Sequence, residues 1–530
     1  MSFRDDYLRQ RTLALSFLDP TWTGEGSRAS AVDETLRTWS PSAPGLAALA
    51  AQNRRWATHP AQLTNLQQVL DGRAAVVVTG QQVGLYGGPL YTLHKAACAI
   101  RLAQQLSDES GTPVVPVFWL QSEDHDDAEI ATATLLDAEA DVTRVTMGGS
   151  LFGERRSVAH LTLDQGAPAG AEELEELLQG GPFAGAVAER AAGYWCGGAR
   201  VVDAFAAQLS EWFGAHGLLM FELRDALAAP AAVELHTWAI RRAGDITQVL
   251  QQRERELVAA GYAAQIAVRP DCALSFWHAA GADGPRYRLQ RAGGETWLVG
   301  GNERRSTSEL ANALNVDPLR ASSSAMLRPL IQDSILPVVA WLGGPAEMLY
   351  AAQMAPLYEL AGVRRPMILP RTHMRWHLQP WQGTLERSGL TLAELTGDVD
   401  RLSVLAGARS GLDWGAVQAR VQESLFAALD AEVQQAGWVA DEAAAISRRA
   451  RGAAIRSARR LTDGLRRASL RRAETAQWMA ARRFFAPTGV PQERILSPLA
   501  IAALMGSERM VERCVERCTP LVAETVEVHG

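Results

Sequence analysis

Short runs of apolar residues alternate with longer amphipathic segments along most of the chain. The apolar runs cover residues 74–79, 113–120, 217–221, 335–342 and 366–369. Uninterrupted runs of this length are typical of strands that are buried on both faces, as in parallel sheets. A helix-length segment follows the first run, and Pro89 occupies a position favoured at the start of a helix. This order predicts an α/β fold with a doubly wound parallel-sheet core.

Two stretches interrupt the alternation, and we expect them to be insertions into the core. The first has β-like segments at 143–147 and 157–163, and the second alternates like a meander. The expected division of the chain is core 1–136, insertion 137–200, core 201–260, β-rich insertion 261–320, core 321–410, α-helical coiled coil 411–485, and a tail 486–530 that packs on the core.

The predicted coiled coil has two arms of opposite charge, which meet near Gly437. Residues 414–447 hold five carboxylates and one arginine, whereas residues 448–483 hold twelve arginines and two carboxylates. We expect the two arms to pair as a helical hairpin. A nucleic-acid-binding helix is disfavoured, because the dense basic run 448–472 contains no aromatic residue. The predicted apolar stripes are Val417, Val421, Leu425, Leu429 and Val433 in the first arm, and Ala454, Ala458, Leu461, Leu465 and Ala468 in the second.

Composition favours a cytoplasmic protein. The 530 residues carry a net charge of −7, so nothing global favours a nucleic-acid or anionic-membrane partner. Five cysteines without paired spacing do not form a disulfide framework, which favours a reducing compartment. The charged first residues do not form a signal peptide, and no apolar run approaches the roughly 20 residues of a membrane helix.

The loop after the first predicted strand is rich in glycine. Ligands of parallel sheets bind outside the carboxyl ends of strands, and glycines let backbone N–H groups approach a ligand closely. The glycine spacing matches neither a Walker motif nor a dinucleotide fingerprint. We therefore predict an anion-binding cradle of another kind, whose candidate residues are Thr79, Gln81, Gln82, Gly87, Gly88 and Lys95.

An acidic loop follows the second predicted strand. Its candidate catalytic residues are Glu123, Asp124, His125 and Asp126, and Asp127 adds a fourth carboxylate. Carboxylates around a histidine can make it a proton acceptor near neutral pH. Such a cluster can also bind a substrate ammonium group or a hard cation. No metal site is predicted, because neither His-x-x-x-His nor a cysteine pair accompanies the loop, as a zinc site would require.

Further candidates lie near the later strand ends. Arginine recognises carboxylates and phosphates through paired hydrogen bonds, so two arginine-bearing segments are predicted anion clamps. One leads into a second Gly-Gly-Pro turn, and the other follows the last predicted strand. Their candidate binding residues are Arg328, Gln332, Gly343, Gly344, Glu347 and Arg371.

Four long segments carry a resemblance to a known family. They are TGQQVGLYGGPLYTLHK at 79–95, VPVFWLQSEDHDDAEI at 115–130, LRPLIQDSILPVVAWLGGPAEMLY at 327–350 and PTGVPQER at 487–494. In their order and spacing the chain resembles the cysteine-adding enzyme of bacillithiol biosynthesis, the BshC family of cysteine ligases. The resemblance runs through nearly the whole chain, and its last segment adds Arg494 to the candidate binding residues.

The resemblance implies a Rossmann-like core related to nucleotidyltransferases and class I synthetases, with inserted connecting segments. It implies a coiled coil that mediates a homodimer. It also implies the reaction, in which L-cysteine is joined to glucosaminyl malate through an amide in the last step of bacillithiol biosynthesis. The sugar amine must lose a proton in this reaction, and His125 with Asp124 or Asp126 is the hypothetical base.

A carboxylate does not react with an amine without activation, so an activator is expected. A nucleotide (ATP or ADP), with or without Mg²⁺, would serve, and the sequence leaves the cofactor unknown. Lys95 and the glycine-rich turn are candidates to hold its phosphates, and Arg328 and Arg371 to bind the malate carboxylates. Other functions stay open: a nucleotidyltransferase- or synthetase-like ligase acting on another amino or carboxyl substrate, a non-catalytic coiled-coil scaffold, and a metal-dependent amidohydrolase.

Overall fold

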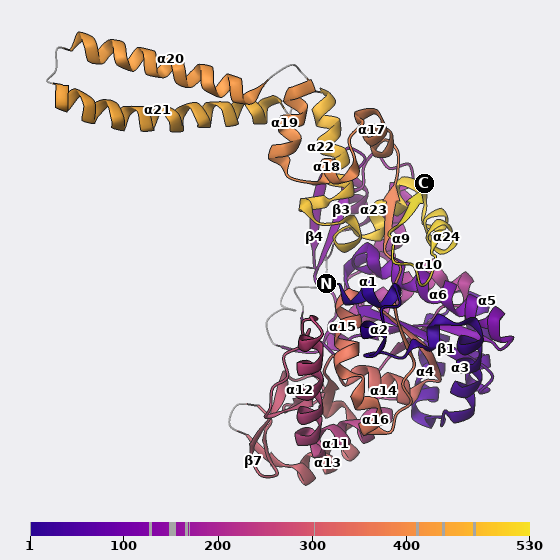
Figure 1. The fold of residues 1–530 in the computed structure, drawn as a ribbon. Coiled ribbons are helices and arrows are strands. Elements are labelled where there is room, and N and C mark those ends of the chain that lie inside the picture. The colour runs from indigo at the N-terminus through magenta and orange to yellow at the C-terminus, as the bar shows by residue number, and fades with distance from the viewer. Residues whose placement is uncertain are drawn as a thin grey trace. The chain divides into compact units, whose positions relative to one another are not determined.

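The structure is a computed structural model in which the chain forms two compact units (Figure 1). The first unit comprises residues 1–138, 142–376 and 493–530, and the second comprises residues 139–141 and 377–492. The seven-part division expected from the sequence is finer than this split and stays a prediction. The structure describes residues 2–126, 130–147, 155–164, 168, 170–300, 303–409, 413–436, 440–469 and 473–530.

A five-stranded parallel sheet forms the centre of the first unit. Its strands, in spatial order, are β12 (Met367–Pro370), β11 (Val338–Gly343), β1 (Ala75–Gln82), β2 (Val114–Gln121) and β5 (Leu219–Glu222). The chain runs outward from β1 through β2 to β5, and then continues on the other side of β1 with β11 and β12. This topology confirms the predicted Rossmann-like core, and its order reverses between β1 and β11.

The sheet forms where the apolar runs predicted it, with one boundary corrected. Val76, Val77 and Val78 are fully buried because both faces of β1 are covered. The predicted strand 335–342 instead begins at Val338. Ile335 ends helix α14 (Arg328–Ile335), and Pro337, which has no N–H group to donate, separates the two elements.

Helices surround the sheet. Helix α6 (Leu90–Ser110) packs against β1 and β2 and ends at Gly111, whose φ of 69° is a left-handed cap. The other helices of the first unit are α1 (Phe3–Leu8), α2 (Thr12–Leu15), α3 (Glu25–Thr38), α4 (Ala43–Trp56), α5 (Pro60–Leu70), α8 (Ala171–Leu177), α9 (Ala184–Tyr194), α10 (Val201–Phe213), α11 (Val233–Arg241), α12 (Ala243–Ala259), α13 (Thr307–Val316), α15 (Pro345–Met354), α16 (Pro356–Ala361), α23 (Pro498–Met505) and α24 (Ser507–Arg517).

Antiparallel strands fill the stretches that interrupt the alternation. The predicted meander is a sheet in the order β10 (Ala321–Ser323), β6 (Cys272–His278), β7 (Arg286–Gly293), β8 (Thr296–Leu298) and β9 (Arg304–Ser306). Trp277, Leu289 and Trp297 form a second hydrophobic core beneath it. Two-stranded sheets join β3 (Thr132–Leu136) to β4 (Val142–Thr146) and β13 (Met374–His377) to β14 (Val526–His529). The β-like segment 157–163 is not a strand, because its centre forms the 3-10 turn Val158–His160.

The second unit is helical. Figure 1 shows α20 (Trp414–Gln435) and α21 (Ala440–Ser469) side by side as two long helices. Asp430 accepts two hydrogen bonds from Arg451, at 2.8 and 2.7 Å, which joins the acidic arm to the basic arm. The turn near Gly437 lies outside the described residues, and coiled-coil packing stays a prediction. The unit also contains α17 (Trp381–Ser388), α18 (Leu392–Thr396), α19 (Val399–Arg409) and α22 (Ala473–Phe485).

Candidate active site

The acidic loop lies at the carboxyl end of β2, where ligands of such sheets bind. Asp124 and His125 form a cluster with Arg286 of β7. The Arg286 Nη1 group donates to Asp124 Oδ1 at 2.7 Å, and His125 Nδ1 lies 3.2 Å from that same oxygen. The cluster therefore joins a loop of the core sheet to a strand of the inserted sheet.

The charges in this cluster are unequally exposed. Arg286 is buried, whereas 30% of the His125 side chain is exposed and Asp126 is exposed. Burial raises the pKa of the Asp124 carboxyl, but the hydrogen bond from His125 and the charge of Arg286 outweigh this effect and hold the pKa well below its usual range. Asp124 is therefore a carboxylate at neutral pH, and both its side chain, 43% exposed, and that of His125 are open to solvent.

Glu123 holds the acidic loop in place. Its buried carboxylate accepts hydrogen bonds from the Ser323 backbone N–H, at 2.9 Å, and from the Ser323 hydroxyl. Its carbonyl oxygen accepts from the Ser157 hydroxyl at 2.8 Å. These contacts fit a positioning role for Glu123, in place of the expected catalytic one. Gln82 donates to Asp124 Oδ2 at 3.4 Å and so connects the end of β1 to the cluster.

The glycine-rich turn is packed against protein. Gly87 and Gly88 are buried, and a Cβ at Gly87 would lie 2.8 Å from the Trp212 ring. The Leu90 N–H at the start of α6 donates to the Leu496 carbonyl at 2.7 Å. Thr79 is also buried, and its hydroxyl donates to the Leu342 carbonyl at 3.1 Å. These residues do not fit the expected phosphate cradle, because protein atoms occupy the space and the N–H group that a phosphate would use.

Lys95 likewise bonds to other groups of the protein. Its buried Nζ donates to the Gly80 carbonyl at 2.7 Å and to Gln81 Oε1 at 3.0 Å, and it lies 2.5 Å from Glu347 Oε2. Glu347 also accepts from the Gly344 N–H at 2.6 Å. Burial lowers the pKa of Lys95, and the charge of Glu347 opposes that effect. The predicted residues do meet where the strand order reverses, between β1 and β11. Their charges and hydrogen bonds, however, pair with one another and not with a ligand.

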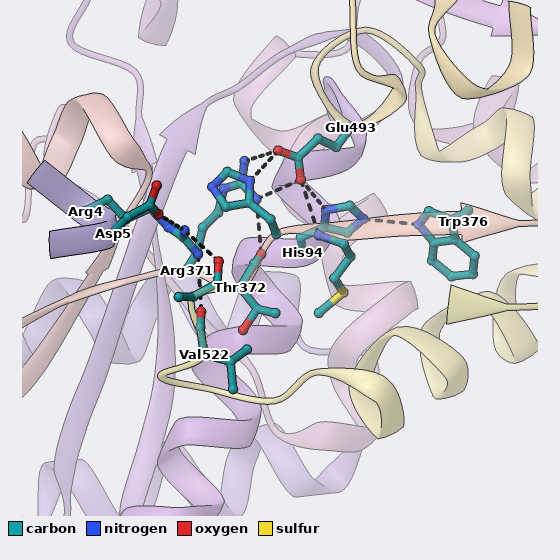
Figure 2. Close-up of polar contacts among 11 residues, drawn as sticks. Arg4, Asp5, His94, Arg371, Thr372, Trp376, Glu493 and Val522 are labelled. Carbon is teal, nitrogen blue, oxygen red and sulfur yellow. Dashed lines mark hydrogen bonds and ion pairs between the residues drawn. The ribbon is translucent and has the colours of Figure 1, made fainter. Parts of the chain in front are cut away.

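Arg371 has an internal carboxylate as its partner. Its guanidinium donates to both oxygens of Glu493, at 3.0 and 2.9 Å, and Glu493 is buried. Figure 2 shows His94 on the other side of this carboxylate, with Trp376 beyond it. Trp376 Nε1 donates to His94 Nε2 at 3.1 Å, so the His94 proton lies on Nδ1, which is 3.3 Å from Glu493. Arg371 is therefore not free to clamp a substrate.

The remaining predicted binding residues are dispersed. Arg494 is exposed, its neighbour Glu493 is buried in the cluster with Arg371, and a binding role for Arg494 stays a prediction. Arg328 donates to the Tyr350 hydroxyl at 3.0 Å. Gln332 is buried and donates to Asp333 at 2.9 Å. Gly343 accepts from the Arg371 N–H at 2.8 Å, which joins the ends of β11 and β12.

A cavity of about 380 Å³ adjoins the acidic loop, and Asp124, His125 and Arg286 line it. Arg286 and Glu493 were missed by sequence reasoning. Arg286 sits in an alternating strand without a motif, and Glu493 lies in a segment recognised only by resemblance. Within the described ranges, no three His, Cys, Asp or Glu side chains are grouped as a metal site would need. None of the described helices is long and apolar enough to cross a membrane.

Comparison with known proteins identifies the family. The model of the N-terminal Rossmann-like domain of bacillithiol biosynthesis BshC matches residues 3–372. A protein from Salinibacter ruber is 31% identical over 398 residues, which cover 75% of this chain and 72% of that protein. One from Solibacter usitatus is 35% identical over 65% of this chain and 59% of its own. One from Geobacillus kaustophilus is 30% identical over 84% of this chain and 83% of its own. All three bear the name "Putative cysteine ligase BshC". The chain therefore belongs to the BshC family.

Proposed function

We propose that the chain adds L-cysteine to glucosaminyl malate and forms an amide, in the last step of bacillithiol biosynthesis. Family membership supports this proposal, and so do the names of the relatives, which describe cysteine ligases. The observation that carries it is the cluster of His125, Asp124 and Arg286, which lies at the carboxyl edge of the sheet and opens on a cavity.

The cluster suits the deprotonation of an amine. The sugar amine is protonated in water and becomes a nucleophile only after it loses a proton. With a proton on His125 Nδ1, which lies 3.2 Å from Asp124 Oδ1 and 3.3 Å from Arg286 Nη1, Nε2 is the nitrogen that accepts the amine proton. Asp124 then stabilises the imidazolium that forms, while Arg286 keeps Asp124 ionised.

The cysteine carboxyl group needs an activator. The glycine-rich turn does not fit nucleotide phosphates, because Gly87 packs on Trp212 and the protons of Lys95 have acceptors within the protein. The turn therefore supports no step through a nucleotide or Mg²⁺. His125, Asp124 and Arg286 act on the amine and not on the carboxyl group.

The test is the thiol content of cells. A strain that lacks this gene should lose bacillithiol and accumulate glucosaminyl malate, both measured by mass spectrometry. Expression of the wild-type chain should restore the thiol, whereas the His125→Ala variant should not. If bacillithiol persists in the deletion strain, the proposal is wrong. Accumulation of another amino or carboxyl compound would instead favour a ligase with a different substrate.

A further inference from the structure

The cavity beside His125 has a basic rim and apolar walls. Arg155, Arg269 and Arg288 line it together with the buried Arg286. Among the described residues that line the cavity, Asp124 is the one carboxylate. The apolar walls come from α12, the loop between α12 and β6, the inserted sheet and the segment before α14, and include Leu250, Ile266, Val268, Phe276 and Met326.

The charge of Arg286 is satisfied within the protein. Its three nitrogens donate to Asp124 at 2.7 Å, to the Ser322 hydroxyl at 3.0 Å and to the Ser323 carbonyl at 2.6 Å. Its guanidinium also lies 3.7 Å from the centre of the Phe276 ring. Arg286, whose Nη1 also lies 3.3 Å from His125 Nδ1, therefore forms a fixed part of the cavity wall and uses most of its donors within the protein.

The rim arginines have weaker partners in the described part of the chain: Arg288 contacts the Cys272 thiol, and Arg155 lies 5.9 Å from the centre of the Tyr287 ring. Among the residues that the structure describes, no carboxylate lies at ion-pair distance from Arg155, Arg269 or Arg288. All three side chains are exposed, and Arg288 lies 5.3 Å from the Phe276 ring. Three cations around one concavity, none with a carboxylate partner among the described residues, repel each other and attract an anion. The charge of the cavity therefore favours a ligand with more than one negative charge.

The lining favours carboxylates over phosphates. Phosphate sites typically use glycine-rich backbone and helix N-termini, and the described residues that line this cavity include no glycine. Separate arginine side chains suit separate carboxylates, each of which accepts two hydrogen bonds from one guanidinium. A volume of about 380 Å³ is also within the range of cavities that hold small organic ligands.

We propose that this cavity binds the two carboxylates of the malate portion of the amino-sugar substrate, through Arg269 and Arg288 with Arg155 at the rim. The inference rests on the proposed function and replaces Arg328 and Arg371 as the expected malate clamp. It places the sugar amine next to His125, because Asp124 and His125 line the same cavity. The sugar ring, which links the malate portion to the amine, sets the distance between the amine and His125.

The first experiment measures binding without catalysis. L-malate is titrated by calorimetry into the wild-type chain and into the Arg269→Gln and Arg288→Gln variants. We expect each variant to bind malate at least about tenfold more weakly, because one paired carboxylate contact is lost. Arg304→Gln is the control, since Arg304 is exposed on β9 of the same sheet and does not line the cavity. Equal malate affinity in all four proteins, or the absence of binding, overturns the proposal.

The second experiment separates this inference from the proposed function. In the Arg269→Gln and Arg288→Gln variants, the KM for glucosaminyl malate should rise at least about tenfold, while the KM for cysteine should stay unchanged. The wild-type preference for glucosaminyl malate over methyl glucosaminide, which lacks the carboxylates, should shrink. Product formation with an unchanged KM contradicts the cavity assignment and leaves the function standing. Malate binding that depends on Arg269 and Arg288, without any product, supports the cavity and contradicts the function. Pyrophosphate binding in place of malate overturns the dicarboxylate assignment.

Discussion

His125 differs from the other predicted site residues in what surrounds it. Lys95 and Arg371 looked similarly functional in the sequence, but each is buried and bound to an internal carboxylate. His125 is part exposed, has a carboxylate at its Nδ1 and faces a cavity. Proton transfer needs both an accessible nitrogen and a partner that orients the ring, and His125 has both.

Replacement of His125 by alanine should therefore reduce turnover about 100-fold or more with the fold intact. The measurement is the rate of bacillithiol formation, together with circular dichroism to verify folding. His216→Ala is a matched control, since His216 is a half-buried histidine of the same unit that does not line the cavity. Activity near that of the wild type in the His125 variant would show that another group accepts the proton.

Glu493 is predicted to act through stability. Its replacement by glutamine leaves the buried Arg371 without a countercharge, which should reduce the free energy of unfolding by about 3–5 kcal/mol. Urea unfolding measures this loss. The control is Glu527→Gln, which breaks the more exposed pair with Arg375 and should cost less than about 1 kcal/mol. Equal losses in the two variants would mean that the buried cluster contributes no more than a surface pair.

Among the elements, the glycine-rich turn has a different role in the structure from the one that its sequence suggested. Its sequence suggested a ligand cradle, yet the turn packs against Trp212 on α10. Gly87 has a φ of 86°, which side-chain-bearing residues adopt at a cost. The same glycines that bring backbone close to a ligand can bring it close to another helix, and the sequence alone does not tell these uses apart.

The Gly87→Ala variant should therefore lose about 1–3 kcal/mol of stability, because it adds both backbone strain and a clash with Trp212. Thermal unfolding measures the loss. Gly26→Ala, inside helix α3 with open space around it, should be neutral or slightly stabilising. Unchanged stability with weaker substrate binding in the Gly87 variant would restore the cradle interpretation.

The helical hairpin leaves part of its apolar surface uncovered. Ala458 is buried as its predicted stripe requires, but Leu461 and Leu465 of the same stripe are 52% and 45% exposed. Leu425 on α20 is 38% exposed, and no residue of that helix is buried. Leu461 and Leu465 are one turn apart and so form a continuous patch on α21.

We predict that this patch lies in the homodimer expected from the family resemblance. The double variant Leu461→Glu and Leu465→Glu should be a monomer, because it buries two charges in the contact. Light scattering after size-exclusion chromatography measures the mass. Val316→Glu, at an 88% exposed position on α13, is the control and should keep the mass of the wild type. A monomeric wild type, or a double variant that remains dimeric, contradicts the prediction.

At the scale of the whole molecule, buried ionisable groups make stability depend on pH. Burial lowers the pKa of His236 to about 4 and that of His278 to about 2. Burial also raises the pKa of Glu493, but hydrogen bonds from His373 and His94 and the charge of Arg371 outweigh it and keep the pKa far below normal. A depressed pKa in the folded state stabilises the protein above the unfolded pKa and loses that contribution on acidification.

The free energy of unfolding should therefore fall as the pH falls below about 6.5, where unfolded histidines take up protons. It should fall further below about 4.3, where unfolded glutamates take up protons. Urea unfolding between pH 8 and pH 5 measures the first part. His236→Gln should reduce the slope by up to about 1.4 kcal/mol per pH unit, the contribution of one proton. A wild type whose stability does not change between pH 8 and pH 5 would contradict the assigned pKa directions.

The sequence by itself determined the sheet and its order of elements. Continuous apolar runs such as Val76–Val78 favour inner strands of a parallel sheet, and loops at the carboxyl ends of such strands meet at one edge. That reasoning led to Asp124 and His125. It could not show which charges at the edge remain available, because Arg286 and Glu493 reach it from segments far away in the chain.

Tertiary structure decided these pairings. Lys95 is neutralised by Glu347 and Arg371 by Glu493, whereas the rim arginines of the cavity have no carboxylate partner in the described structure. The physical reason is that local patterning reports which side chains are buried, since burial follows the period of a strand or helix. The partner of a buried charge depends instead on which distant segment packs against it.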